Sequence, residues 1–262
     1  MRNQFNLFFS LFFFPYIVYA EADPCKGDNM LLSIINRPSF SDSSCTVPKN
    51  TLLIEGGFQN QKLIGIGTQR NGPELSARVG LSNNSEFVIT PSNYIHQTRV
   101  PFSGTTPLWM GIKYRFYYNK NWIISGEGLF SPPSGNENFG SPHSEATING
   151  MISNKLTNEL SWQLQMGIST FSDPLIQGGQ QFQSINPIFS VSYTLKNIST
   201  YIEFVGQSKT SAHESLGIAG GGGIIFLFNT KTTLDMTFYQ RITGKFQGFN
   251  NLIGVGATHL FG

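Results

Sequence analysis

Strict alternation between large apolar residues and small or polar residues is the feature of this sequence that most restricts its fold. In the stretch Leu160–Ser169 every second residue is large and apolar. The stretch Met110–Phe116 repeats the pattern, with two cations on its second face. A helix would need apolar residues three and four positions apart, and these stretches lack that spacing. The pattern therefore predicts β-strands with one apolar face.

From about residue 50 onward the chain divides into about twelve such segments, each long enough for the roughly 9–11 tilted residues with which a strand crosses a bilayer. Alternation is weakest in 85–96, which contains Pro91, and in 216–228, which is mostly Gly and Ile. The predicted strands cover residues 51–61, 74–81, 85–96, 106–117, 121–131, 144–155, 159–170, 184–195, 198–208, 216–228, 232–243 and 250–261.

The connections between these segments alternate in length. The short turns all contain Asn, which tolerates the left-handed backbone of a tight hairpin; they are 82–84, 119–120, 157–158, 196–197 and 229–231. The long connections are rich in Gly, Ser, Pro, Gln and Asn; they are 62–73, 97–105, 132–143, 171–183, 209–215 and 244–249. Outer-membrane barrels have short periplasmic turns and longer outer loops. We therefore predict an all-β, antiparallel transmembrane barrel of about 12 strands, with both ends of the barrel on the short-turn side.

Composition separates this prediction from a soluble β-sandwich. Charged residues make up 12% of the chain, which also has 28 Gly and 23 Phe. A soluble domain carries about a quarter charged residues, many of them on its outward face. Here the face opposite the apolar residues is mostly Gly, Ser, Thr, Asn and Gln, which favours the membrane barrel. A net charge of +2 does not indicate nucleic acid as a partner.

The first 22 residues have the pattern of a secretory signal peptide. Arg2 precedes an apolar run, Leu7–Val18, and Ala20-Glu21-Ala22 is a small-x-small cleavage site. A membrane-anchoring helix is the alternative, but the run is shorter than the roughly 20 residues of a span, and Pro15 interrupts it. We expect export and insertion into a bacterial outer membrane.

Cys25 and Cys45 are the two cysteines of the chain. An even count in an exported chain favours a disulfide, whereas a metal pair lacks further Cys or His nearby. Closing a loop of about twenty residues stabilises the segment by roughly 3 kcal/mol in the chain-entropy model. We therefore divide the chain into a signal peptide (1–22), an N-terminal segment with a disulfide (23–48) and a barrel (49–262).

Aromatic residues lie near the ends of the predicted strands, where two girdles are expected at the headgroup level. Those near the short turns are Tyr117, Tyr118, Trp122, Trp162, Tyr193, Phe226, Phe228 and Phe261. Those near the long loops are Tyr94, Trp109, Phe130 and Phe171.

Ionic and amide side chains gather on the face opposite the large apolar residues. An ion facing lipid at the midplane costs roughly 2–4 kcal/mol, so these groups must face the interior. Two interpretations remain open: a paired network that makes the interior rigid, or a lining that selects solutes. The candidates are Glu55, Arg78, Lys113, Arg115, Glu127, Gln163, Gln165, Glu203, Asp235 and Arg241.

Catalytic and metal-binding patterns are weak. His143 and Ser144 are adjacent, so their side chains would point to opposite faces of a strand. The run Gly220–Gly223 lacks the Gly-Lys-Ser/Thr of a phosphate loop and is typical of a strand kink or a place where another side chain packs closely. The four His residues show no metal-ligand spacing. We predict neither an enzyme nor a bound metal or cofactor.

Several short motifs resemble the outer-membrane transporter family of the meta-pathway of phenol degradation and its uncharacterised gammaproteobacterial relatives. They are Gly111-Ile112-Lys113-Tyr114, Leu129-Phe130-Ser131-Pro132-Pro133-Ser134-Gly135, Asn36-Arg37-Pro38 and Gly206-Gln207-Ser208-Lys209-Thr210. The resemblance implies a barrel, and for part of the family the passage of small hydrophobic or aromatic solutes. No residue here identifies phenols. Gly262 follows Phe261, although the residue read by the barrel insertion machinery is usually a terminal aromatic.

Two functions follow from these features. The first is a channel or transporter for small solutes, hydrophobic ones included, whose interior the segment 23–48 narrows or plugs; about eight strands give a filled interior and sixteen to eighteen a wide channel. The alternative is a surface protein that does not transport, whose loops 132–143 and 171–183 bind a host or envelope partner. Outer-membrane lipid and the insertion machinery are the other expected partners.

Overall fold

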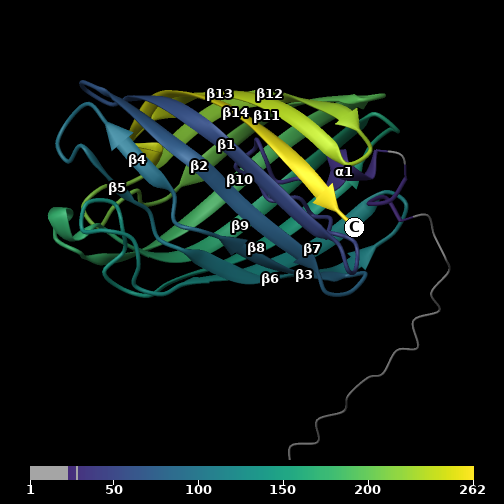
Figure 1. Cartoon of the computed structure of the whole chain (residues 1–262), viewed down its shortest axis with the longest axis horizontal. Coiled ribbons are helices and arrows are strands. Elements are labelled where there is room, and N and C mark those ends of the chain that lie inside the picture. The colour runs from purple at the N-terminus through teal and green to yellow at the C-terminus, as the bar shows by residue number, and fades with distance from the viewer. Residues whose placement is uncertain (1–22, 28) are drawn as a thin grey trace, which may run out of the picture.

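The computed structural model describes residues 23–27 and 29–262, so the predicted signal peptide lies outside the described part. Within it, twelve antiparallel strands form a closed ring, because each pairs with the next and β1 pairs with both β14 and β2 (Figure 1). The predicted barrel is confirmed. The strands are β1 (Leu52–Leu63), β2 (Thr68–Gly80), β3 (Ser85–Thr90), β6 (Trp109–Tyr118), β7 (Trp122–Ser131), β8 (Glu145–Lys155), β9 (Leu160–Ser172), β10 (Gln181–Leu195), β11 (Ile198–Gln207), β12 (Gly217–Asn229), β13 (Thr232–Thr243) and β14 (Phe249–Phe261).

Helical structure is confined to three short pieces of the described chain: α1 (Met30–Ile34), η1 (Leu175–Gln177) and η2 (Phe246–Gly248). Across residues 23–27 and 29–262, no helix has the length and apolar character needed to cross a membrane.

Pro91 divides the segment 85–96, which the sequence predicted as one strand. β3 ends at Thr90, and the chain resumes as β4 (Tyr94–Gln97), which forms a hairpin with β5 (Ser103–Thr105). Proline has no N–H for a ladder hydrogen bond, so the strand breaks there. β4 then pairs with the outer end of β2, Asn71 opposite Ile95, and the hairpin extends the sheet at the end of the barrel away from the C-terminus (Figure 1).

The prediction of a long loop at 62–73 was wrong. β1 and β2 remain paired as far as Lys62 and Thr68, so the connection is only 64–67. The longer connections 132–144, 173–180, 208–216 and 244–248 leave the same rim, which we call the outer rim. The short turns and both ends of the barrel lie at the opposite rim.

Burial alternates along the strands as a lipid-facing barrel requires. On β11, Tyr201 and Glu203 are buried, whereas the neighbouring Ile202 is 65% exposed and Phe204 is 54% exposed. Large apolar side chains are exposed in the same way on the other strands, so the exterior of the barrel is apolar, whereas its interior holds the ions and other polar groups together with a buried apolar cluster that includes Leu31, Leu53 and Leu252.

The glycine run of β12 lies under two tyrosines of the interior. A Cβ atom on Gly221 would stand 2.4 Å from the ring of Tyr239, and one on Gly223 would stand 2.8 Å from the ring of Tyr201. The prediction that other side chains pack closely against this run is confirmed.

Two aromatics expected in the outer girdle face the interior instead. Trp109 shares the face of β6 that carries the buried Lys113, and its ring centroid is 6.3 Å from that of Phe171 on β9. Phe171 in turn lies 5.9 Å from Phe182. Because β7 and β8 separate β6 from β9, these rings meet across the interior just inside the outer rim. The girdle prediction was wrong for them, since rim position does not decide which face a residue takes.

Candidate solute pathway

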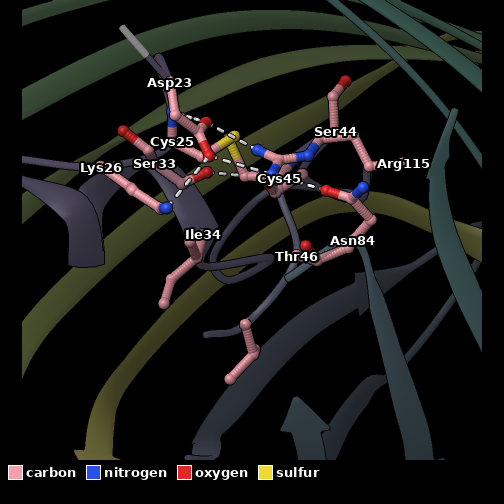
Figure 2. The surroundings of a disulfide bond; sticks show 12 residues. Asp23, Cys25, Lys26, Ser33, Ile34, Ser44, Cys45, Thr46, Asn84 and Arg115 are labelled. Carbon is pink, nitrogen blue, oxygen red and sulfur yellow. Dashed lines mark hydrogen bonds and ion pairs between the residues drawn. A yellow bond between two sulfur atoms is a disulfide. The ribbon is translucent and has the colours of Figure 1, made fainter. Parts of the chain in front are cut away.

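Residues 23–48, which we call the inner segment (residue 28 is outside the described part), lie within the barrel. Cys25 and Cys45 form a disulfide with a Cα–Cα distance of 5.6 Å. Beside it, Asp23 accepts two hydrogen bonds from Arg115, with N–O distances of 2.7 and 2.9 Å (Figure 2). This pair fastens the start of the inner segment to β6.

The irregular backbone of the inner segment is bonded to side chains of the wall. The main-chain N–H groups of Phe40 and Ser41 donate to the Glu203 carboxylate at 2.8 and 3.1 Å. Those of Asn36 and Arg37 donate to Glu55 at 2.7 and 3.1 Å. Buried N–H groups must find acceptors, and here the wall supplies them in place of a neighbouring strand. Further donors to the wall are the N–H groups of Asp42, Ser44 and Val47, bonded to Gln165, Gln163 and Glu86.

A buried ion network joins β1, β2, β3 and β6. Arg78 lies 3.5 Å from Glu55 and 2.8 Å from Glu86, and Lys113 lies 3.1 Å from the same Glu86 oxygen. All four side chains are fully buried. Alternating charges compensate one another, so no ion of this network is left alone in the interior. Arg78 also donates to the carbonyl of Ile34, which ties the network to the inner segment.

Glu86 belongs to this network but was not among the residues predicted to face the interior. It accepts hydrogen bonds from Arg78 and from the N–H of Val47, and it forms an ion pair with Lys113. The next residue, Phe87, and Ile89 two positions further are apolar and share the face of β3 opposite to Glu86, and this alternation is the signal that places Glu86 on the inward face.

Arg37 lies flat on glycines at the middle of β1 and β14. Gly57 and Gly256 are directly paired, and a Cβ on either would stand 2.2 or 2.5 Å from the guanidinium. The guanidinium lies 3.1 Å from Glu74 and 3.5 Å from Asp235. Glycine at both positions therefore leaves the space that Arg37 occupies. We call residues 37–42 the tip of the inner segment.

The tip of the inner segment reaches across the interior. Phe40 packs against Tyr239 and Phe246, with ring centroids 4.6 and 5.4 Å apart. On the far side, the Asp42 carboxylate accepts from Gln165 at 3.3 Å and from Asn149 at 3.5 Å. The tip thus contacts β1, β2, β8, β9, β11 and β13.

The structure places the predicted interior residues in three groups. Glu55, Arg78, Lys113, Arg115 and Glu127 lie on β1, β2, β6 and β7, where Glu127 accepts from Asn149 at 3.2 Å. Gln163, Gln165, Glu203 and Asp235 contact the inner segment. Arg241 lies apart at the outer rim, where it donates to Asn250 and to the carbonyl of Gly244.

A cavity of about 280 Å³ remains between the inner segment and the wall. It extends from Asn158 and Glu159 at the short-turn rim to Arg37 at mid-height. Residues with a hydroxyl group are the most frequent kind in its lining, which also includes the charged Lys26, Lys155 and Glu159. The Ser and Thr residues of the wall are Ser153, Ser161, Ser190, Ser192, Thr194 and Ser199, and those of the inner segment are Ser33, Ser39, Ser41, Ser43 and Ser44.

The outer end is covered by loops that bond to one another. Asn136 donates its N–H to Thr105 on β5 at 3.1 Å, and Ile176 donates to the carbonyl of Glu137 at 3.2 Å. Ala212 donates to Asp173 at 3.2 Å. These bonds join the connections 132–144, 173–180 and 208–216 to one another and to β5 at the outer rim, where Trp109, Phe171 and Phe182 also lie.

No group of three His, Cys, Asp or Glu side chains among the described residues is arranged to hold a metal ion. The site instead consists of three features. They are the cavity, the inner segment that is hydrogen-bonded to the wall beside it, and the aromatic residues Trp109, Phe171 and Phe182 near the outer rim.

Comparisons with known proteins agree with this picture. The model of the family described as "Putative MetA-pathway of phenol degradation" matches residues 35–252. No curated protein matches the chain. An outer membrane channel from Pseudomonas putida F1 is similar in structure, with a TM-score of 0.68 and 12% identity over 85% of this chain and 100% of that chain. The KdgM porin (TM-score 0.56) and the NanC porin (TM-score 0.55) are each 12% identical over 79% of this chain and 98% of theirs.

Proposed function

We propose, from the premise that this chain belongs to the phenol-degradation MetA-pathway family, that it is an outer-membrane channel or transporter for small solutes. Its structural relatives are channels and porins, and we assign it no catalytic role. We further propose that residues 1–22 direct export and that Phe261, at the end of β14, is the aromatic that the insertion machinery reads.

The cavity beside the inner segment is the observation that carries this proposal. A structural filler would pack against the whole wall, as the segment does at the ion network. Along β8–β11 it instead leaves a continuous space lined by hydroxyl groups. Small hydroxyl side chains hydrogen-bond a passing solute without holding it by charge, and weak binding at several points favours conduction.

The aromatic trio Trp109, Phe171 and Phe182 at the outer mouth supports hydrophobic solutes as part of the range. Phe171 packs against both Trp109 and Phe182, with ring centroids 6.3 and 5.9 Å apart, so the three rings together offer an apolar surface that a flat apolar molecule can contact. A solute entering from outside would meet these rings first and the hydroxyl-lined space afterwards. The tip of the inner segment lies between the two, so we propose that its displacement opens the path.

Substitution of Ser192 by Trp tests the pathway. Ser192 lines the cavity from β10, so an indole there fills the space, and we expect solute uptake into proteoliposomes to fall about tenfold. Uptake of small uncharged solutes, with and without an aromatic ring, is the measurement.

The matched control is Ile202→Trp, on the neighbouring strand but 65% exposed on the exterior. It should leave uptake unchanged. The channel proposal would be wrong if the wild-type barrel showed no conductance in planar bilayers and did not speed the uptake of any solute into liposomes. Equal uptake by the wild type and by Ser192→Trp would show that solutes do not pass through the cavity.

A further inference from the structure

The charged residues of the strands are sorted unequally between the two faces of the barrel. In the part of the chain that the structure describes, every Asp and Glu of a strand lies on the inward face, as Glu55, Glu86 and Glu203 do. Lys62 and Arg70, by contrast, are exposed on the outward face. Their neighbours along the strands, Gln61 and Gln69, bond to each other inside the barrel at 3.3 Å.

These two cations lie together at the outer rim. Arg70 on β2 is paired with Asn60 on β1, and Lys62 is paired with Thr68, so the two side chains are diagonal neighbours. On the other side of Arg70, β4 places the exposed His96 directly opposite it. Like charges held side by side repel, so this arrangement favours an anion between them.

The β4–β5 hairpin adds a third cation. Arg99 lies at the hairpin tip and donates to the carbonyl of Ile64 in the β1–β2 connection at 3.2 Å. Thr98 donates its N–H to the carbonyl of Thr68 at 2.9 Å. These contacts hold the hairpin tip, with Arg99, against the connection that joins the strand of Lys62 to that of Arg70. We call Lys62, Arg70, His96 and Arg99 the rim cluster.

The height of the rim cluster matches the lipid headgroups. Phe58, four residues below Lys62 on β1, is 61% exposed and its ring lies over Gly72. On β14, the apolar Ile253 is 46% exposed, and two residues higher Asn251 stands opposite Lys62. Phe58 lies near the middle of β1, and a tilted strand rises roughly 2.5 Å per residue, so Lys62 stands roughly 10 Å higher, near the upper edge expected for an apolar band about 25 Å tall.

We propose that the rim cluster binds the phosphate groups of a phosphorylated glycolipid in the outer leaflet. Three permanent cations and a histidine, with no acid on the same face, complement the two phosphates of such a headgroup. Phe58 and Ile253 below them contact its acyl chains. A lipid is the occupant because the cluster faces sideways, at the upper edge of the apolar exterior, and not into the interior or the loops.

The test is a titration of the full-length protein in neutral detergent with bisphosphorylated lipid A, followed by the shift in thermal unfolding. A cation near such a surface contributes about 1 kcal/mol, so the double variant Lys62→Gln/Arg70→Gln should bind about 30-fold more weakly. Added salt should weaken binding by the wild type. The control, Lys120→Gln/Lys196→Gln, removes two exposed cations from turns of the opposite rim and should bind as the wild type does.

Three outcomes would overturn the proposal. They are a loss of less than threefold in the rim variant, an equal loss in the control, and equal binding of dephosphorylated lipid A. Inorganic phosphate is tested separately. If phosphate alone shifts the thermal unfolding transition as far as the lipid does, the cluster is a site for free anions and the lipid proposal is wrong. The inference rests on outer-membrane placement and not on transport, so liposome uptake and lipid titration can fail independently.

Discussion

At the level of single residues, Glu203 accepts three hydrogen bonds, two of them from the inner segment and one from another strand of the wall. Its carboxylate accepts from Phe40, Ser41 and the hydroxyl of Tyr239, the last at 2.6 Å. Glutamine at this position keeps one acceptor oxygen. Its NH₂ group is itself a donor, so it cannot accept the hydrogen bonds that the second carboxylate oxygen accepted. Leaving buried donors without an acceptor costs about 1–3 kcal/mol.

We therefore expect Glu203→Gln to loosen the tip of the inner segment. Cleavage of residues 36–48 by added protease should become faster in the folded protein, and channel openings in planar bilayers more frequent. Glu137→Gln is the control, because this exposed glutamate lies on an outer loop. Identical cleavage of both variants would show that Glu203 does not hold the tip.

Residue identity also shows where prediction from sequence succeeds. Glu55, Arg78, Lys113 and Glu203 follow from alternation alone, because an ion on the lipid face is too costly. The partners of these residues do not follow. Arg37 and Asp42 belong to a segment without alternation, and only the folded chain brings them against Glu74, Asp235 and Gln165.

At the level of elements, the inner segment combines one five-residue helix with a disulfide and otherwise irregular backbone. Closing a loop of about twenty residues stabilises such a segment by roughly 3 kcal/mol. The strands of the barrel do not depend on this closure, because their hydrogen bonds form a ring of their own.

The variant Cys25→Ser/Cys45→Ser should consequently lose order in the inner segment alone. We expect amide hydrogen exchange at Phe40, Ser41 and Val47 to become at least about tenfold faster, which is less than the full entropic effect. Amides of β8 and β9 serve as the internal reference and should exchange as in the wild type. Unchanged exchange at all three amides would mean that wall contacts alone hold the segment.

The strand boundaries show what the alternation of residues within one segment cannot predict, namely where a strand begins and ends. Pro91 directly follows the end of β3, which its missing N–H explains, although the predicted strand 85–96 continued through this proline. The pairing of β1 with β2 beyond residue 62 has no such marker. The length of these two strands depends on their hydrogen bonds to each other, and not on a pattern within either strand.

At the level of the whole molecule, the exterior must match lipid in height as well as in polarity. Ile202, at the middle of β11, is 65% exposed, and Phe228, at the short-turn end of β12, is 68% exposed. Lysine at the bilayer midplane of a barrel costs about 2–4 kcal/mol, and near the interface about 0–1 kcal/mol.

Ile202→Lys should therefore destabilise the folded barrel far more than Phe228→Lys, although the two side chains are almost equally exposed. Urea titration of folding into phospholipid vesicles measures both free energies. In lipid-free detergent the difference should shrink, since a micelle adapts around a lysine more easily than a bilayer does and lets its ammonium group reach water. Equal costs in vesicles would mean that the apolar band does not span the bilayer at this height.

Sequence alone determined the barrel, its approximate strand number, the rim that carries the long loops and the inward face of the ions. These properties depend on local alternation and turn chemistry, which each segment carries by itself. Only the tertiary structure decided that Trp109 and Phe171 meet inside the outer mouth, that Glu86 joins Arg78 to Lys113, and that the inner segment leaves a hydroxyl-lined space. Such contacts join residues far apart in the chain, and they exist only once the ring has closed around the segment.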